Sequence, residues 1–174
     1  MTPAKTTRAK SPASDQERQI EGFLSKYTPE LIAAGKDARK RMRERISGGT
    51  EFVYDNYNAL VFGFGPTERP SDAVLSLALM PRWVTLCFLK GAQLPDPKKL
   101  LRGSGNIVRN IRLDSVERLD DPDVRDLIDK AIEGAAPRFP AGNTRPITVV
   151  KSVSAKQRPR RPSPAKKSRS RKTS

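Results

Sequence analysis

The densest set of potential metal ligands in this 174-residue sequence is an acidic run within its last helical pattern. At 100° per residue, four carboxylates fall within one arc of such a helix, opposite its apolar side chains: Asp123, Asp126, Asp129 and Glu133. Carboxylate oxygens are the ligands that hard cations prefer. This acidic ridge is therefore a candidate for a weak metal site. The alternative is a solvated helix face whose first-turn acids offset the helix dipole.

The sequence lacks several residue types that catalysis commonly uses. It contains no histidine and a single cysteine, Cys87. This composition excludes a Ser-His-Asp or Cys-His arrangement, a His-ligated zinc site and an intrachain disulfide. No pair of residues marks an active site built from carboxylates, tyrosine or lysine. We therefore expect a non-enzymatic protein and rank an enzyme last.

A polar and aromatic cluster is the best candidate for a small-molecule or cofactor pocket. It is a run of consecutive residues outside strict strand alternation: Tyr54, Asp55, Asn56, Tyr57 and Asn58. Such clusters in loops often bind ligands. Arg109 is a further candidate, because strand alternation puts it on the same side as Ile107 and Ile111, where a charge must be paired or lie at the rim. It belongs either to a polar pocket or to a sheet edge from which its charge reaches water.

The net charge of +15 comes entirely from the two ends of the chain. All 19 acidic residues lie between Asp15 and Glu133, where an equal number of Lys and Arg residues makes the net charge zero. The chain after Gly134 carries +12 and no acid. Such a segment binds phosphates without reading a base sequence. Its candidate anion-binding residues are Arg158, Arg160, Arg161, Lys166, Lys167, Arg169, Arg171 and Lys172. The expected partner is non-specific nucleic acid or another polyanion, and the alternative is a solubilising tail without a dedicated partner.

Hydrophobic spacing predicts the elements that position these side chains. Apolar residues recur at helical spacing in residues 16–26, 29–46 and 122–133, and Thr28 and Asp121 each stand as an N-cap before a proline. Between them, alternating or wholly apolar segments predict strands at residues 51–54, 59–64, 73–80, 82–89 and 107–113. Residues 96–101 are expected to form a short helix. The helix at 29–46 carries a basic ridge that is either a phosphate contact or an ordinary polar face: Lys36, Arg39, Lys40 and Arg43.

This order of elements predicts the α+β class. We expect N-terminal helices, a mainly antiparallel sheet of about five strands, and a C-terminal helix packed on one face, together spanning residues 15–135. Residues 1–14 and 136–174 are expected to be disordered basic tails, with 147–153 as a candidate edge strand. The sequence has no apolar stretch long enough to cross a membrane, so we expect no membrane contact and a cytoplasmic location.

Five segments carry a family resemblance. They are residues 54–60 (Tyr-Asp-Asn-Tyr-Asn-Ala-Leu), 63–69 (Gly-Phe-Gly-Pro-Thr-Glu-Arg), 94–97 (Leu-Pro-Asp-Pro), 103–113 (beginning Gly-Ser-Gly-Asn and ending Ile-Arg-Leu) and 151–161 (Lys-Ser-Val-Ser-Ala-Lys-Gln-Arg-Pro-Arg-Arg). Together they resemble the YdhG-like domain family, a bacterial group of unknown function, over about residues 20–161.

The resemblance implies a frataxin-like fold, with helices flanking a sheet of about five strands. One branch of the family is described as a frataxin-like iron chaperone; this sequence has Tyr-Asp-Asn-Tyr-Asn where that branch has Trp-Gly-x-Pro. The resemblance therefore implies a binding or carrier module with iron as the candidate metal. The basic C-terminal tail indicates the alternative, a nucleic-acid-associated protein without sequence preference.

Overall fold

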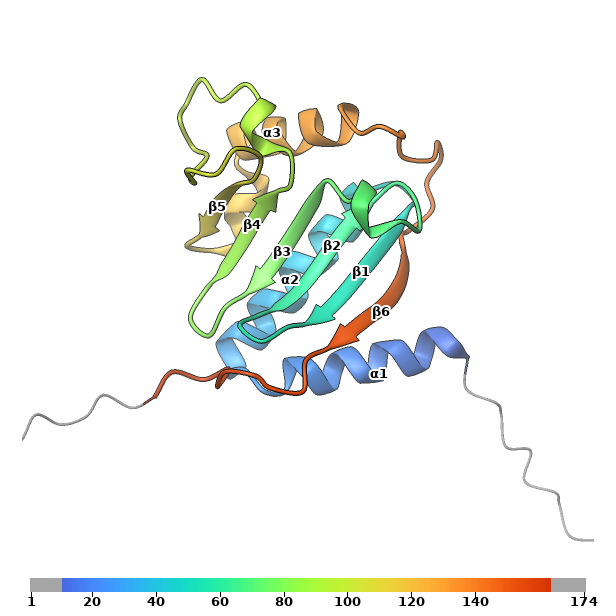
Figure 1. The fold of residues 1–174 in the computed structure, drawn as a ribbon, viewed down its shortest axis with the longest axis vertical. Coiled ribbons are helices and arrows are strands. Elements are labelled where there is room, and N and C mark those ends of the chain that lie inside the picture. The colour runs from blue at the N-terminus through green and yellow to red at the C-terminus, as the bar shows by residue number, and fades with distance from the viewer. Residues whose placement is uncertain (1–10, 164–174) are drawn as a thin grey trace, which may run out of the picture.

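The computed structural model describes residues 11–163 and begins with two helices (Figure 1). α1 spans Pro12–Leu24 and α2 spans Pro29–Arg45. Each helix starts at a proline that follows a hydroxyl N-cap, Ser11 or Thr28. The side chain of each cap accepts a hydrogen bond from a backbone N–H of the first turn, which stabilises the helix start. The two predicted N-terminal helices are confirmed.

A six-stranded sheet follows within the described residues. Five strands form consecutive antiparallel pairs: β1 (Thr50–Asp55), β2 (Leu60–Gly65), β3 (Leu75–Leu79), β4 (Val84–Phe88) and β5 (Arg109–Leu113). After α3 (Pro122–Glu133), the chain returns as β6 (Ile147–Val153), which pairs parallel with β1. The strand order is β5-β4-β3-β2-β1-β6. Short 3₁₀ turns lie at η1 (Pro70–Asp72), η2 (Gly91–Gln93) and η3 (Val116–Asp120).

The predicted mainly antiparallel sheet of about five strands with a C-terminal helix is wrong, and so is the frataxin-like arrangement. Within residues 11–163 the sheet is mixed, has six strands and ends in a strand, not a helix. β6 lies at an edge of the sheet and confirms the candidate edge strand predicted at residues 147–153, although these residues are beyond the predicted domain limit at residue 135. Its side chains are exposed or half-buried, so its own pattern does not show which strand it joins. Pairing with β1, which is distant in sequence, makes it part of the sheet.

The predicted short helix at residues 96–101 is also wrong. The carboxylate of Asp96 accepts hydrogen bonds from Leu100 N (2.9 Å) and Leu101 N (2.8 Å), and the segment forms turns. A short acidic side chain can satisfy nearby backbone amides without a helix. The local signal at Asp96 was therefore a turn signal.

One face of the sheet carries the hydrophobic core. α1, α2 and α3 contribute Ile20, Met42 and Leu127 to the same buried cluster as Phe62 of β2 and Leu86 of β4. The opposite face is turned toward the viewer in Figure 1 and carries no α-helix among the described residues. No helix within residues 11–163 is long and apolar enough to cross a membrane.

Other parts of the chain partly cover both edges of the sheet. At the β6 edge, the side-chain oxygen of Gln16 in α1 accepts a hydrogen bond from Val150 N at 2.9 Å. At the β5 edge, Arg102 and Asn110 exchange two backbone hydrogen bonds of 2.8 and 2.9 Å. Pairing edge amides in this way reduces edge-to-edge association between molecules.

Glu51 is a buried carboxylate on the core side of β1, with no exposed surface. Arg39 of α2 donates to both of its oxygens, at 2.7 and 2.8 Å. Arg43 of α2 also donates to it, and the hydroxyl of Thr148 in β6 donates at 2.7 Å. A desolvated carboxylate requires such partners. Glu51 therefore joins α2, β1 and β6 at one point.

Asp55 is a second buried carboxylate, on the same side of β1 and at its other end. Lys26, in the segment between α1 and α2, donates to its Oδ2 at 2.5 Å, and Arg160 donates to its Oδ1 at 2.9 Å. The Arg160 side chain is only 2% exposed. The chain after β6 is thus held against the end of β1 by a buried ion pair.

We expect Arg160→Met to lower the free energy of unfolding by about 2–4 kcal/mol, because Asp55 loses its buried partner. The matched control is Arg161→Met, which removes the same charge from the exposed neighbouring position and should change stability by less than ~0.5 kcal/mol. Chemical denaturation of both full-length variants, followed by circular dichroism, measures the two values. Equal losses would show that the Arg160 contact does not stabilise the fold.

Candidate functional site

The predicted pocket at residues 54–58 is occupied by the chain's own C-terminal segment. Ser154 N donates to Asp55 O at 2.8 Å, Arg158 N donates to Tyr57 O at 2.8 Å, and the Arg158 guanidinium lies 5.7 Å from the Tyr57 ring centre. Arg160 also donates to the Asn56 carbonyl. The cluster therefore serves as a docking site for residues 154–160, and of its remaining members Tyr54 is half-buried and Asn58 is exposed.

The ionisation of Asp55 depends on this arrangement. Burial by itself would raise the pKa of the Asp55 carboxyl, but hydrogen bonds, first of all the one from Lys26, outweigh burial and lower its pKa below the ordinary value. The nearby Tyr27 hydroxyl donates to Leu79 O (2.8 Å) and accepts from Leu60 N (2.9 Å), and burial raises its pKa. The Asp55 carboxylate and the Tyr27 hydroxyl therefore both have hydrogen-bond partners within the fold.

Arg109 does not join this cluster. It begins β5, at the opposite edge of the sheet from β6. Its Nη1 donates to the carbonyls of Gly105 and Val108, the second at 2.8 Å. Of the two alternatives drawn from the sequence, the structure shows the sheet edge.

Two carboxylates of the acidic ridge on α3 form ion pairs with different basic residues. Asp126 accepts a hydrogen bond from Lys130 at 2.5 Å, and Asp129 pairs with Arg45 of α2 at 2.8 Å. Asp123 and Glu133 lie in the first turn and at the end of α3. Within residues 11–163, no group of three or more His, Cys, Asp or Glu residues could hold a metal ion. We therefore propose no metal site on this ridge.

The predicted anion-binding residues fall into two groups. Arg158 and Arg161 are exposed, whereas Arg160 is buried against Asp55. Lys166, Lys167, Arg169, Arg171 and Lys172 lie outside the described residues. On the basic ridge of α2, Arg39 and Arg43 form ion pairs with Glu51. Lys36 forms an ion pair with Glu21 at 2.7 Å.

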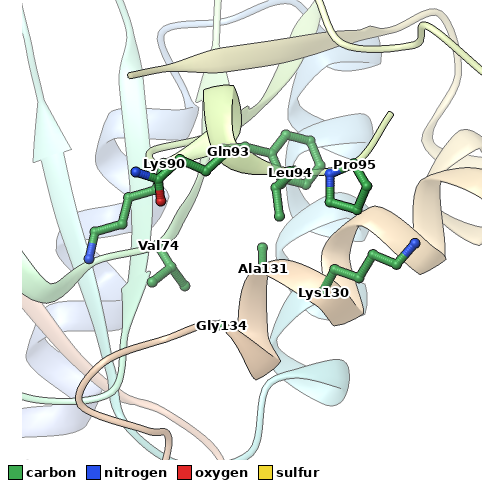
Figure 2. A pocket seen from close by; sticks show the side chains of 9 residues that line it. Val74, Lys90, Gln93, Leu94, Pro95, Lys130, Ala131 and Gly134 are labelled. Atoms are coloured by element: carbon green, nitrogen blue, oxygen red, sulfur yellow. The ribbon is translucent and has the colours of Figure 1, made fainter. Parts of the chain in front are cut away.

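A cavity of about 350 Å³ lies between η2 and α3, and none of the predicted site residues is among its lining residues (Figure 2). Val74 directly precedes β3 and Phe88 ends β4, and the two strands meet at this point, where Leu89 N donates to Val74 O at 2.9 Å. The lining residues are Val74, Phe88, Lys90, Gln93, Leu94, Pro95, Lys130, Ala131 and Gly134. Its volume lies within the range of small-ligand sites, roughly 300–1,000 Å³.

Small residues shape the two walls of this cavity. A Cβ on Gly91 would lie 2.6 Å from the Arg109 Cβ and 2.9 Å from the Phe88 Cβ, so only glycine lets η2 approach β4 and β5 this closely. On the facing wall, the short side chain of Ala131 points from α3 toward Leu94 (Figure 2). Gly134 ends α3, so the helix does not extend across the cavity.

The polar groups of the cavity are placed unevenly. Figure 2 shows the side chains of Lys90 and Gln93 at one side and that of Lys130 at the other, with Val74, Leu94 and Ala131 between them. Lys130 already donates to Asp126, whereas Lys90 has no ion-pair or side-chain hydrogen-bond partner within the described part of the chain. The cavity thus has an apolar middle and one uncompensated positive charge at its edge.

The polar side chains that line the cavity are two lysines and one glutamine, Lys90, Lys130 and Gln93. The lining includes no carboxylate, hydroxyl, thiol or imidazole, so its titratable groups are the two lysine amines. Cys87 precedes Phe88 in β4, so strand alternation turns its thiol to the opposite face of the sheet. Burial raises the pKa of that thiol, which disfavours the reactive thiolate.

Sequence reasoning did not predict this cavity. Its residues come from separate segments around Val74, Leu94 and Ala131, and no local pattern shows that they meet. The available signals are the glycine that begins η2, Gly91, and a small residue on the apolar face of α3, Ala131. Comparisons of the chain with protein-family models, with curated proteins and with solved structures found no match.

The lowered pKa of Asp55 predicts a loss of stability in acid. A carboxylate whose pKa is lower in the folded protein stabilises it above the unfolded value of about 3.9, and this contribution is lost as the pH falls through the folded pKa. Asp55→Asn should therefore be less stable than the wild type at pH 6, with the difference shrinking toward pH 2. Thermal melts across this range measure it, and Glu133→Gln controls for the loss of one charge. A difference that stays constant down to pH 2 would contradict the assignment.

Proposed function

We propose that the protein is a non-enzymatic module that binds a small organic molecule in the cavity between η2 and α3. The observation that supports this most directly is an apolar space of about 350 Å³ whose edges carry Lys90, Gln93 and Lys130. Apolar walls with a few polar groups are typical of ligand sites. The two lysines have no carboxylate, hydroxyl, thiol or imidazole beside them in the lining, and this favours binding over catalysis.

The size of the cavity limits the ligand to a small one. At ~30 Å³ per non-hydrogen atom, as in liquid water, 350 Å³ accommodates about 12 such atoms. A ligand of this size gains roughly 0.3 kcal/mol per atom at drug-like efficiency, so a simple probe should bind with a Kd in the low millimolar range.

The test uses 3-phenylpropan-1-ol, a neutral probe of ten non-hydrogen atoms, and methyl NMR of the full chain. We expect the probe to shift the methyl signals of Val74, Leu94 and Ala131. Ala131→Phe should weaken this binding at least ~10-fold, because its ring would occupy the cavity. Ala33→Phe adds the same ring at an exposed position of α2 and is the matched control. No shift at these methyls, or equal binding by both variants, would reject the cavity as the site.

A second candidate function is non-specific nucleic-acid binding through the C-terminal end of the chain, which the charge distribution favours. Residues 162–174 hold five Lys and Arg residues and no acid. Removing only these residues keeps β6 and Arg160, so the deletion separates charge from folding.

Deletion of residues 162–174 should abolish most binding to duplex DNA in a fluorescence-anisotropy titration. If the five charges each engage a phosphate, the affinity of the full chain falls by about 500-fold between 50 and 200 mM salt through counterion release. Unrelated DNA sequences should compete equally, since a polycation reads no base edges. Deletion of residues 1–10, which hold three basic residues, is the control. Binding that survives the C-terminal deletion would place the DNA contact on residues 1–161.

A further inference from the structure

We infer that the ligand of the η2–α3 cavity is a small monocarboxylate with an apolar body of about eight to ten carbon atoms. This inference rests on the proposed binding function and adds the chemical class of the ligand. It is drawn from the volume of the cavity, its apolar middle and the position of its one uncompensated charge.

The apolar body follows from the middle of the cavity. Val74 and Phe88 are buried, and Leu94 and Ala131 are half-buried, so together they present a continuous hydrocarbon surface. A polar molecule placed there would lose hydration without gaining hydrogen-bond partners. The volume of about 350 Å³ leaves room for about 12 non-hydrogen atoms, two of which would be the carboxylate oxygens.

The anionic end follows from Lys90. Of the two lysines that line the cavity, Lys130 is neutralised by Asp126 at 2.5 Å, which leaves Lys90 as the free ammonium. The C-terminal end of α3 at Gly134 contributes only about half a negative charge, so a positive charge remains at this edge. Gln93 adds an amide donor at the same side of the cavity (Figure 2). These two donors match the two oxygens of a carboxylate.

The same donor set argues against a phosphate ester. Phosphate sites are commonly built from a guanidinium fork or from several amides at a helix N-terminus. The lining of this cavity has neither, and the helix end that borders it is a C-terminus. One ammonium and one amide suffice for a single negative charge.

Three probes with the same phenylpropyl body separate the alternatives: 3-phenylpropionate, 3-phenylpropan-1-ol and 3-phenylpropylamine. We expect the propionate to bind about 10-fold more tightly than the alcohol, and the amine to bind most weakly. Affinities come from the methyl shifts of Val74, Leu94 and Ala131 in the full chain at low salt, because the preference should decrease as salt rises.

Lys90→Gln should reduce the affinity for the propionate to that for the alcohol and leave the alcohol unchanged. Lys98→Gln removes an exposed lysine outside the cavity lining and should change neither. Equal binding of propionate and alcohol by the wild type, or tighter binding of the amine, would overturn the carboxylate inference while leaving the binding function intact. If no probe shifts these methyls, both the binding function and the inference fail.

Discussion

Burial of two carboxylates on one face of β1 is the constraint on which the rest of the fold depends. Glu51 and Asp55 project into the core side of the sheet with Val53 between them, and none of the three side chains is exposed. A buried carboxylate without partners costs several kcal/mol. Arg39 and Lys26 therefore have to reach β1 from the helical region, and Thr148 and Arg160 from the C-terminal region. These contacts make β6 and the segment after it part of the folded structure.

The ion pairs and the cavity occupy different parts of the molecule. The ion pairs of Glu51 and Asp55 stabilise the half of the sheet that contains β1 and β6. The cavity lies beside β4, η2 and α3 (Figures 1 and 2). The cavity is bordered by the end of a strand and the end of a helix, both supported by buried residues such as Phe88 and Leu127. Rigid elements hold its walls, while Lys90 and Gln93 lie in and next to a short turn at its edge. A binding site that combines rigid apolar walls with adaptable polar groups needs little rearrangement to accept a ligand.

Where the sequence predicted structure well, the signal was local and strong. α2 and α3 each start at the predicted capped proline, and α3 ends at Gly134. α1 begins at Pro12 after the Ser11 cap, four residues before the predicted start at residue 16. The strands β1 to β5 were found because their apolar residues alternate or are continuous. The helix predicted at residues 96–101 was wrong because a carboxylate before a proline can begin a turn as well as a helix. In either structure the Asp96 carboxylate lies near the backbone amides that follow it. The aromatic cluster at residues 54–58 was recognised as unusual, but its partner was the chain itself.

The sequence by itself determined the starts of α2 and α3, the antiparallel strands, the exclusion of histidine chemistry and the separation of charge between a neutral middle and basic ends. These properties depend on neighbouring residues or on composition, so they can be read along the chain. Only the tertiary structure decided that Ile147–Val153 pairs parallel with β1, that Arg160 is a buried partner of Asp55 and not a free cation, and that Val74, Leu94 and Ala131 line one cavity. Each of these contacts joins residues that are far apart in sequence. They are stabilised by the pairing of desolvated charges and by the packing of apolar surface, and both arise only when the chain has folded.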